Sequence, residues 1–430
     1  MAVNNRSSCR TVALALLLVG CGSDPTAGTS DASDTTRALD ITSADSDDTL
    51  VTSATDTGDT TASDSTTSDA APDTSTPGPV MKLHVLDVGQ GDALIVELPC
   101  GAMLVDTGGE TTAASGGSPG FDSDDALEAQ LAAFFASRPD LHDTLDVVVL
   151  THPHLDHTHG VPRLIDMVEA GHLHILNVVT NGDESGFDSG LDEQIQLHDF
   201  ADADPSIGRW YVLQRKTTAA GFTNDIIDPF GACAAGGGLD PSVTALWGRI
   251  DQDNPLSATW DPADLDNANN HSVVLRVQLG QGSMLLTGDL EEAGIAALIA
   301  QYKDTGLLDV DVYKVGHHGS YNGTTAALVN LMTPRVAVIS SGPDDRIGTY
   351  TAYAYGHPRW HAVSDLLGDV DSHGVTGTRP LAIDAPVATA YADDHGIFEP
   401  IHVARAVYCT GWEHHAVVVT VHADGTVDAP

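Results

Sequence analysis

The sequence predicts an α/β fold for the residues that follow about position 80. First, short apolar runs such as 147–150, typical of buried strands, alternate with segments such as 124–138, whose apolar residues recur at helical spacing. Second, these runs end in short polar or glycine-containing loops, a pattern typical of layered α/β domains whose loops carry function. Third, hydrophobic residues make up 42% of the 430 residues, which is enough for a sizeable core.

The individual elements follow from the local pattern. Apolar or alternating runs predict strands at 81–88, 93–98, 102–105, 147–150, 175–179, 273–279, 284–286, 310–315, 336–340, 403–408 and 416–421. Apolar residues at helical spacing predict helices at 124–138, 160–169, 291–302 and 324–332. The turn Pro99-Cys100-Gly101 makes the second and third strands a hairpin, and Pro139 follows the end of the first helix.

One long segment departs from this regular pattern. Residues 181 to about 268 are polar and rich in Gly, Asp and Pro, with a single expected strand at 210–213. We therefore interpret this segment as an irregular insertion, which could overhang a site, within one domain covering 80–430.

Residues 1–21 have the pattern of a bacterial export signal. Arg6 and Arg10 are followed by the apolar run 11–19, which is too short to span a bilayer as a stable helix. The stretch Leu18-Val19-Gly20-Cys21 resembles the lipobox of bacterial lipoproteins, in which the cysteine receives lipid. The alternative is an ordinary signal peptide with a chance cysteine. We expect an exported protein held at a bacterial cell-envelope membrane by lipid on Cys21.

A linker is expected between this signal and the folded part. Residues 22–79 are rich in Ser, Thr, Asp, Ala and Gly and contain almost no large apolar side chains. Such a segment cannot bury enough apolar surface to offset the entropy of ordering it. The composition therefore predicts a disordered, acidic tether.

Charge and cysteine content restrict the partners further. The net charge is −43, from 18 basic and 61 acidic residues, so the surface repels phosphate backbones and broad binding of duplex nucleic acid is disfavoured. Of the five cysteines, Cys100, Cys233 and Cys409 lie outside the signal. One disulfide and one free thiol are possible, and the sequence does not pair them.

The stretch T-H-P-H-L-D-H-T-H-G at 151–160 carries the strongest chemical signal. It directly follows the buried strand 147–150 and places His152, His154, Asp156 and His157 within six positions. Imidazole nitrogen and carboxylate oxygen are ligands for zinc, manganese or iron. The alternative, chance clustering in a chain with 20 histidines, is disfavoured by this spacing at a strand end.

Three more predicted strands end in residues of the same kind. Asp106 follows the strand 102–105, Asp289 follows 284–286, and the pair His317-His318 follows 310–315. A single aspartate at a strand end is often only a turn or cap residue. Together with the histidine stretch, however, these residues predict a shared metal site at one edge of the sheet.

Eight sequence blocks occur in a fixed order along the chain: L-D-V-G-Q-G-D-A at 86–93, L-V-D-T-G at 104–108, H-P-H-L-D-H at 152–157, S-V-V-L-R-V at 272–277, L-L-T-G-D-L at 285–290, K-V-G-H-H-G-S at 314–320, A-V-I-S-S-G at 337–342 and Y-G-H-P at 355–358. In these blocks the chain resembles the metallo-β-lactamase superfamily, and within it the hydrolase domain of the ComEC-type competence DNA-uptake protein and its stand-alone exported relatives. The resemblance implies a four-layer αββα sandwich with metals at one sheet edge.

The resemblance also implies roles for the site residues. Residues His152 and His154 would hold one metal and Asp156 and His157 a second, with Asp289 as a bridge and His317 or His318 completing a shell. Asp106 would orient a ligand from behind. His271 is a possible extra ligand, where many superfamily members carry another histidine, or else a plain loop residue. His357 would contact substrate or act as a general acid, or else is a turn residue before Pro358.

The expected function is therefore that of a dinuclear metal-dependent hydrolase. Two divalent ions, most simply Zn with Mn or Fe as alternatives, would generate a metal-activated hydroxide, with Asp156 orienting it as well as binding metal. The preferred substrates are small-molecule or short phosphoesters and phosphodiesters; a local pocket with Lys314 and Arg346 leaves short single strands open. The alternatives are hydrolysis of an ester, lactone or β-lactam carbonyl, and a metal-stabilised surface binding protein without catalysis.

Overall fold

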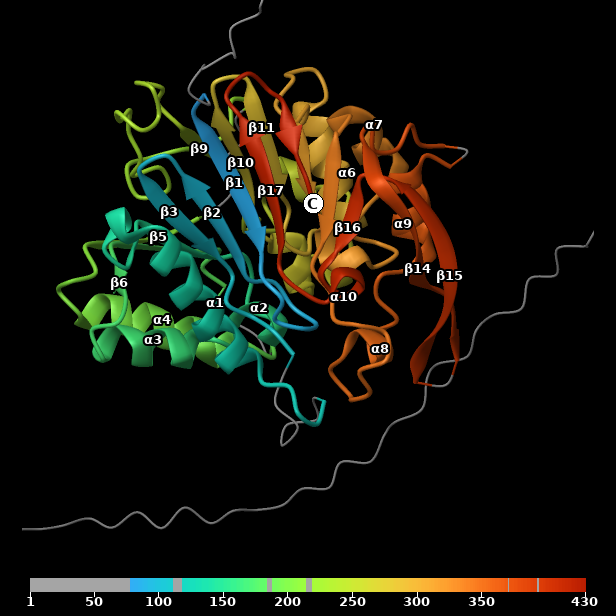
Figure 1. Ribbon diagram of the computed structural model, residues 1–430, viewed down its shortest axis with the longest axis horizontal. Coiled ribbons are helices and arrows are strands. Elements are labelled where there is room, and N and C mark those ends of the chain that lie inside the picture. The colour runs from blue at the N-terminus through green and yellow to red at the C-terminus, as the bar shows by residue number, and fades with distance from the viewer. Residues whose placement is uncertain (1–77, 111–117, 184–187, 214–218, 370, 393) are drawn as a thin grey trace, which may run out of the picture. The chain divides into compact units, whose positions relative to one another are not determined.

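The computed structural model describes residues 78–110, 118–183, 188–213, 219–369, 371–392 and 394–430 (Figure 1). The predicted export signal, the lipidation site Cys21 and the linker up to residue 77 lie outside the described residues. None of the described helices is long and apolar enough to cross a membrane.

The first sheet brings together strands from both ends of the described chain. Its order is β18 (Val427–Asp428), β17 (Val417–His422), β1 (Val80–Val85), β2 (Leu94–Leu98), β3 (Gly101–Val105), β5 (Val147–Leu150), β7 (Asn177–Thr180) and β8 (Arg209–Val212). The strands β2 and β3 form the predicted hairpin, and β3, β5, β7 and β8 run parallel. The loops after β3 and β5 therefore leave the sheet at the same edge.

The second sheet supplies a matching edge. Its order is β16 (Val407–Cys409), β13 (Val336–Ile339), β12 (Val312–Lys314), β11 (Gly282–Leu286), β10 (Val274–Leu279) and β9 (Ser242–Trp247). The strands β11, β12, β13 and β16 are parallel, so the loops after β11 and β12 also share an edge.

Alternating side chains place the two sheets face to face between helices. On β2, Leu94 and Val96 belong to the core that includes the second sheet, whereas Ile95 faces the helices on the other side. That outer layer consists of α1 (Ser123–Ser137), α3 (Val161–Glu169) and α4 (Leu191–Ala203), and the opposite layer of α6 (Glu292–Tyr302), α7 (Ala326–Met332) and α9 (Trp360–Leu367). The result is the αββα order that the family resemblance implied (Figure 1).

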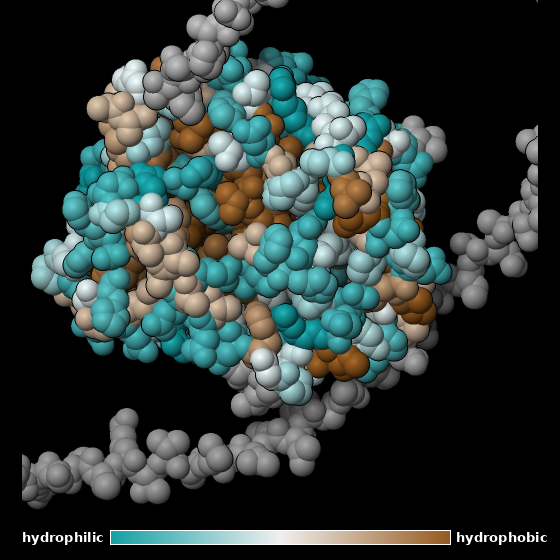
Figure 2. Space-filling model, in the orientation of Figure 1, coloured by the Kyte–Doolittle hydropathy of each residue, from teal (hydrophilic) through white to brown (hydrophobic). Residues whose placement is uncertain are grey.

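Short helices and turns connect these layers. They are α2 (Leu155–Thr158), α5 (Pro262–Asp266), α8 (Ala352–Tyr355), α10 (Thr410–Glu413) and the 3-10 turns η2 (Pro139–Leu141), η3 (Pro255–Ser257), η4 (Ala268–His271) and η5 (Gly316–Gly319). Two small sheets, β4 (Thr144–Leu145) with β6 (His174–Ile175) and β14 (Thr378–Ala392) with β15 (His395–Arg405), complete the elements described. On the face seen in Figure 2 the surface is largely hydrophilic, with apolar side chains gathered over β1 and β17.

The segment 181–268 contains more regular structure than the sequence predicted. The segment contains the helix α4 and the strand β9 in addition to β8, so it contributes an edge strand to each main sheet. The periodicity of α4 was hidden because only Gln194, Leu197 and Ala201 of this helix are buried. A disulfide between Cys100 and Cys233 ties the insertion to the β2–β3 turn and leaves Cys409 as a buried thiol, which resolves the pairing that the sequence left open.

Candidate metal centre

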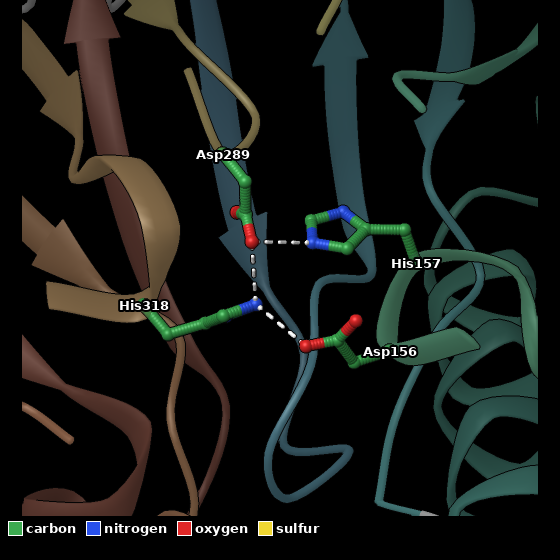
Figure 3. Close-up of side chains that lie close together, drawn as sticks. All are labelled: Asp156, His157, Asp289 and His318. Carbon is green, nitrogen blue, oxygen red and sulfur yellow. Dashed lines mark ion pairs between the residues drawn. The ribbon is translucent and has the colours of Figure 1, made fainter. Parts of the chain in front are cut away.

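Four side chains from three loops converge at the shared edge of the two sheets (Figure 3). Asp156 and His157 come from α2 after β5, Asp289 follows β11, and His318 lies in η5 after β12. His157 Nε2 lies 3.1 Å from Asp289 Oδ2, and His318 Nε2 lies 3.3 Å from both Asp289 Oδ2 and Asp156 Oδ2. One ligand atom from each of the four residues lies within 4.8 Å of the others, a spacing that a single metal ion can bridge.

The bonding of this cluster fits a cation. Among the described residues, His157 Nε2, His318 Nε2 and Asp289 Oδ1 are buried without a hydrogen-bond partner. Buried polar atoms are rarely left unpaired, and those that are need an explanation such as an ion. Imidazole nitrogens and carboxylate oxygens directed at one point are the donor set of zinc and other transition metals.

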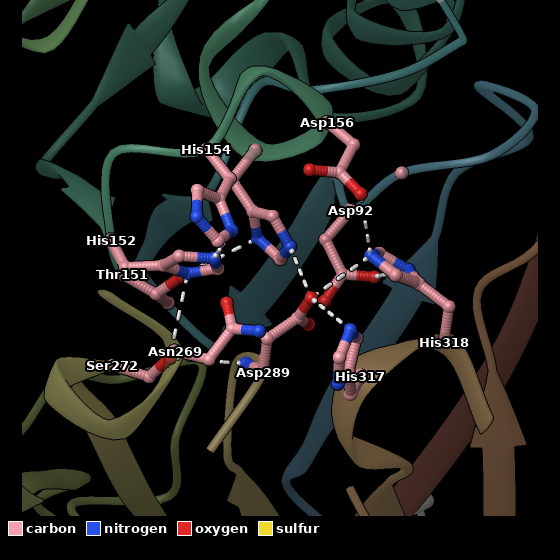
Figure 4. Close-up of polar contacts among 12 residues, drawn as sticks. Asp92, Thr151, His152, His154, Asp156, Asn269, Ser272, Asp289, His317 and His318 are labelled. Carbon is pink, nitrogen blue, oxygen red and sulfur yellow. Dashed lines mark hydrogen bonds and ion pairs between the residues drawn. The ribbon is translucent and has the colours of Figure 1, made fainter. Parts of the chain in front are cut away.

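His152 and His154 lie beside this group (Figure 4). Their facing nitrogens, His152 Nε2 and His154 Nδ1, are 3.1 Å apart. The ring centroid of His152 is 4.2 Å from that of His157, so this pair adjoins the cluster. The structure thus brings together all four ligand-type residues predicted from the stretch 151–160.

Asp106 holds His157 from behind. Its Oδ2 accepts a hydrogen bond from His157 Nδ1 at 2.8 Å, and its Oδ1 accepts one from the Thr151 backbone at 2.7 Å. Burial raises the pKa of Asp106, although the neighbouring His157 opposes that shift. This contact orients Nε2 of His157 toward Asp289, the arrangement in which a carboxylate behind a histidine strengthens it as a ligand. The adjacent Gly108 is required because a Cβ there would collide with the Asp156 carbonyl.

Asp92 was missed by the sequence reasoning. Its Oδ1 lies 3.3 Å from His318 Nδ1, and its Oδ2 accepts a hydrogen bond from Lys314 Nζ at 2.8 Å. Burial would raise the pKa of Asp92, but Lys314 and His318 outweigh burial and lower it to about 2. The only available signal was its place in the block 86–93, two residues before β2, where it could pass for a turn residue.

Lys314 and Arg346 do not form the cationic substrate pocket that the sequence left open. Lys314 is 1% exposed and is bound to Asp92. Arg346 Nη1 donates to Glu110 at 3.1 Å, and its guanidinium lies 3.7 Å from the Phe121 ring centroid. Both cations are therefore engaged with the protein itself.

Of the two adjacent histidines, the structure places His318 in the cluster. His318 is fully buried, and both of its nitrogens face carboxylates. The side chain of His317 is 19% exposed, with Nε2 3.7 Å from Asp289 Oδ2 and Nδ1 3.4 Å from Glu291 Oε1. Both residues have left-handed backbone angles, φ 48° and 52°, so the turn is held in a costly conformation that presents both rings.

His271 does not join the site. Its Nδ1 accepts a hydrogen bond from the Ile250 backbone at 3.1 Å, and its Nε2 donates to the Leu265 carbonyl at 2.8 Å. Both nitrogens are consumed in holding the insertion to η4. The suggestion that His271 is an extra ligand is therefore corrected: His271 connects two loops through hydrogen bonds to their backbones.

His357 lies above the cluster with one nitrogen fixed. Ser341 Oγ donates to Gln90 Oε1 at 3.2 Å, and Gln90 Nε2 donates to His357 Nδ1 at 3.1 Å. Burial holds the pKa of His357 well below its usual value, and the nearby His317 and His318 lower it further. In this arrangement the imidazole is neutral and carries its proton on Nε2.

Charge is distributed unequally among the ligands. Burial would raise the pKa of Asp289, but His157, His318 and His317 hold it well below its usual range. Burial would lower the pKa of His157 and His318, but Asp289 and the other carboxylates around them raise both well above the usual value. Burial and its histidine neighbours hold the pKa of His152 well below 6.5, so this ligand is neutral. The site thus gathers several ionised carboxylates, whose negative charge favours the binding of cations.

A small pocket opens onto these ligands. Its volume is about 260 Å³, and it is lined by Gln90, His154, Asp156, Ser189, Asn269, Asp289, His317, Tyr355 and His357. Burial, with the charge of Asp156 adding to it, raises the pKa of Tyr355 to about 12, so its hydroxyl remains protonated. The pocket wall is therefore made of hydrogen-bonding side chains that come from several loops.

Residues 86–213 match the family model described as the metallo-beta-lactamase superfamily. The chain is also similar to ComEC-type competence proteins, as the sequence blocks predicted. It is 26% identical to ComE operon protein 3 of Bacillus subtilis over 64% of this chain and 29% of that protein. It is 35% identical to competence protein ComA of Neisseria gonorrhoeae over 27% of this chain and 16% of that protein.

The chain spans less than a third of the length of these two relatives. Among solved structures, the metallo-beta-lactamase fold protein YhfI of Bacillus subtilis aligns with a TM-score of 0.32 and 12% identity, over 60% of this chain and 85% of that one.

Proposed function

We propose that this protein is a dinuclear metal-dependent hydrolase of phosphoester or phosphodiester bonds. Members of the metallo-β-lactamase superfamily are usually metal-dependent hydrolases, and the chain has side chains that could bind a metal ion. The observation that carries the proposal is the convergence of buried, unpaired ligand atoms of His157, His318 and Asp289 beside the His152–His154 pair.

The ligand sets support two adjacent ions. His152 and His154 would hold the first, and Asp156, His157 and His318 the second, with Asp289 between them. Zn²⁺ suits this mixture of imidazole and carboxylate, and Mn²⁺ or Fe²⁺ are alternatives. When bound, such ions supply an activated water molecule and neutralise developing negative charge.

The residues of the pocket would do the remaining work. His357 would offer its Nε2 proton to an oxygen of the substrate, because Gln90 occupies Nδ1. Tyr355 stays protonated and offers a second hydroxyl donor at the pocket wall. Asp156, whose carboxylate faces His318 Nε2 at 3.3 Å, can also accept a hydrogen bond from the attacking water and so orient it.

The size and polarity of the pocket favour a phosphoryl group over a bulky ring. A volume of about 260 Å³ lies just below the range of about 300–1,000 Å³ for small-molecule sites. The net charge of −43 disfavours long polyanions, since the protein's field opposes their approach. Small or short phosphoesters therefore fit better than duplex nucleic acid.

The location is part of the proposal and rests on sequence alone. The export pattern at 1–21 and the lipobox-like Cys21 support a lipid-anchored protein on a bacterial cell-envelope membrane. Replacement Cys21→Ala in the natural host should move the protein from the membrane fraction to the soluble fraction. A protein that stays with the membrane despite this change would argue against lipid on Cys21.

The function is tested by metal analysis beside substrate hydrolysis. The purified full-length protein should contain about two divalent ions per chain and should hydrolyse bis-p-nitrophenyl phosphate. Two ions with hydrolysis of only carboxylic esters, lactones or β-lactams would transfer the activity to carbonyl substrates. Failure to take up metal after reconstitution with Zn²⁺, Mn²⁺ and Fe²⁺ would overturn the hydrolase proposal and leave a binding role.

A further inference from the structure

Asn269 places an unpaired carbonyl oxygen at the metal centre. It lies in η4, and it lines the same pocket as His154 and Asp289. The residue is 6% exposed, and its Oδ1 is buried without a hydrogen-bond partner among the described residues. Figure 4 shows the Asn269 side chain next to Asp289, on the side of His152 and His154.

The orientation of this amide is fixed by its other end. Asn269 Nδ2 donates to Glu291 Oε1 at 2.7 Å, while the second oxygen of Glu291 accepts from Asn267 Nδ2 at 2.8 Å. A carboxylate only accepts hydrogen bonds, so a reversed amide would set oxygen against oxygen. Glu291 therefore forces Oδ1 of Asn269 to face the ligand cluster.

The neighbouring residues show that this arrangement is particular to one position. Asn270 is as buried, but its Nδ2 donates to Asp264 O at 3.1 Å and its Oδ1 accepts from Gly294 N at 3.1 Å. His271 also uses both ring nitrogens on backbone atoms. Only Asn269 of these three consecutive residues leaves an acceptor open, and that acceptor faces the metal centre.

We infer that Asn269 is a metal ligand, its amide oxygen joining His152 and His154 around the first ion. This inference rests on the proposed metal centre and adds a ligand to it. An amide oxygen is a neutral, hard donor, better suited to Mn²⁺ than to Zn²⁺, which binds imidazole more strongly. The first site, with two imidazoles and one amide, would therefore bind Zn²⁺ more weakly than a site made of three imidazoles.

The test is titration of the full-length protein, stripped of metal, with Zn²⁺ and with Mn²⁺ against a chromophoric chelator. The wild type should bind two ions. In Asn269→Ala the metal affinity of one of the two sites should fall by about 10- to 100-fold. Loss of a residue that only supports a ligand typically lowers metal affinity by this factor, so loss of a ligand should lower it at least as much. Asn269→His should instead tighten that site for Zn²⁺ by about 10-fold or more and favour Zn²⁺ over Mn²⁺.

Two comparisons keep the result clear. Asn270→Ala removes an equally buried amide from the same turn, so it should lower thermal stability while both ions bind as in the wild type. If Asn269→Ala fails to fold, Asn269→His carries the test, because it supplies a ligand rather than removing one.

Zn²⁺ and Mn²⁺ binding by Asn269→Ala or Asn269→His that matches the wild type would overturn the inference and leave the metal centre intact. A wild type that binds neither ion would instead overturn the proposed function and the inference with it.

Discussion

Both edges of the paired sheets carry buried carboxylates, but the two edges differ in whether the carboxylate oxygens have partners within the protein. At the metal edge, where the candidate ligands converge, Asp289 Oδ1 is buried without a hydrogen-bond partner among the described residues. Its Oδ2 faces the Nε2 atoms of His157 and His318, which are also buried without a hydrogen-bond partner in the described part of the chain. At the far edge, Asp311 accepts from the Ser283 backbone at 3.0 Å and pairs with Arg335 at 3.1 Å. Glu97 on β2 is likewise surrounded by Lys82, His84 and Arg138.

The larger cavity lies at the edge whose carboxylates are already paired, and the smaller one lies at the metal edge. The far edge holds a cavity of about 890 Å³ beside Asp309 and Asp311, whereas the pocket at the metal edge has about 260 Å³. The carboxylates beside the larger cavity already have partners within the protein: Thr333 Oγ1 donates to Asp309 Oδ1 at 2.7 Å. Unpaired ligand atoms therefore locate chemistry better than empty volume does. Acids at the far edge stabilise the fold, whereas those at the metal edge could bind a metal ion.

The largest contrast should come from two aspartates of the second sheet. Asp289→Ala should lower kcat/KM by more than about 10³-fold and remove at least one bound ion, exceeding the ~10- to 100-fold typical of residues behind a ligand. Asp311→Asn should keep activity and metal but lower the melting temperature, because it weakens the contacts to Ser283 and Arg335. Elemental analysis, phosphodiester kinetics and thermal unfolding of both variants make the comparison. Equal effects of the two changes on activity would contradict the distinction between the edges.

A smaller effect is expected for His357, which lies at the metal edge but outside the ligand set. His357→Ala should lower kcat by about 10²- to 10³-fold, the usual loss for one donor to developing charge. The number of bound ions should not change, since the contacts of His357 run to Gln90 and not to a carboxylate of the cluster. Steady-state kinetics beside metal analysis would separate the two roles. Loss of an ion from this variant would make His357 a ligand instead.

The smallest effect concerns Glu97 at the far edge and depends on pH. Burial would raise the pKa of Glu97, but His84, Lys82 and Arg138 lower it from 4.5 to about 2. Because the folded-state pKa is depressed, the stability that it contributes is present above pH 4.5 and is lost as pH falls through about 2. Glu97→Gln should therefore cost about 1–2 kcal/mol at pH 7, after allowance for solvent screening, and almost nothing near pH 2.

Denaturant unfolding of the Glu97 variant at the two pH values measures this difference. Phosphodiester hydrolysis at pH 7 serves as its control and should be unchanged. A destabilisation that persists undiminished at pH 2 would assign the effect to packing rather than to charge.

The sequence was most informative where chemistry and chain order coincide. We could predict site residues in the stretch 151–160, at Asp106 and Asp289, and in the pair His317-His318, because each lies at or shortly after the end of an apolar strand. Asp92 and Asn269 could not, since their importance depends on Lys314, His318 and Glu291, which are distant in sequence. The adjacency of His271 to β10 pointed to the wrong residue, because only the fold shows that both its nitrogens hold backbone atoms.

The position of β17 beside β1 bears on how the chain acquires its shape. Val80 is paired with His422, so the strand that opens the first sheet gains one neighbour only when almost all of the described chain has been synthesised. During vectorial synthesis, one backbone edge of β1 would stay open to other strands. Contacts that span so much sequence slow folding and lengthen exposure to aggregation. A holding chaperone during synthesis should therefore raise the soluble yield of this protein.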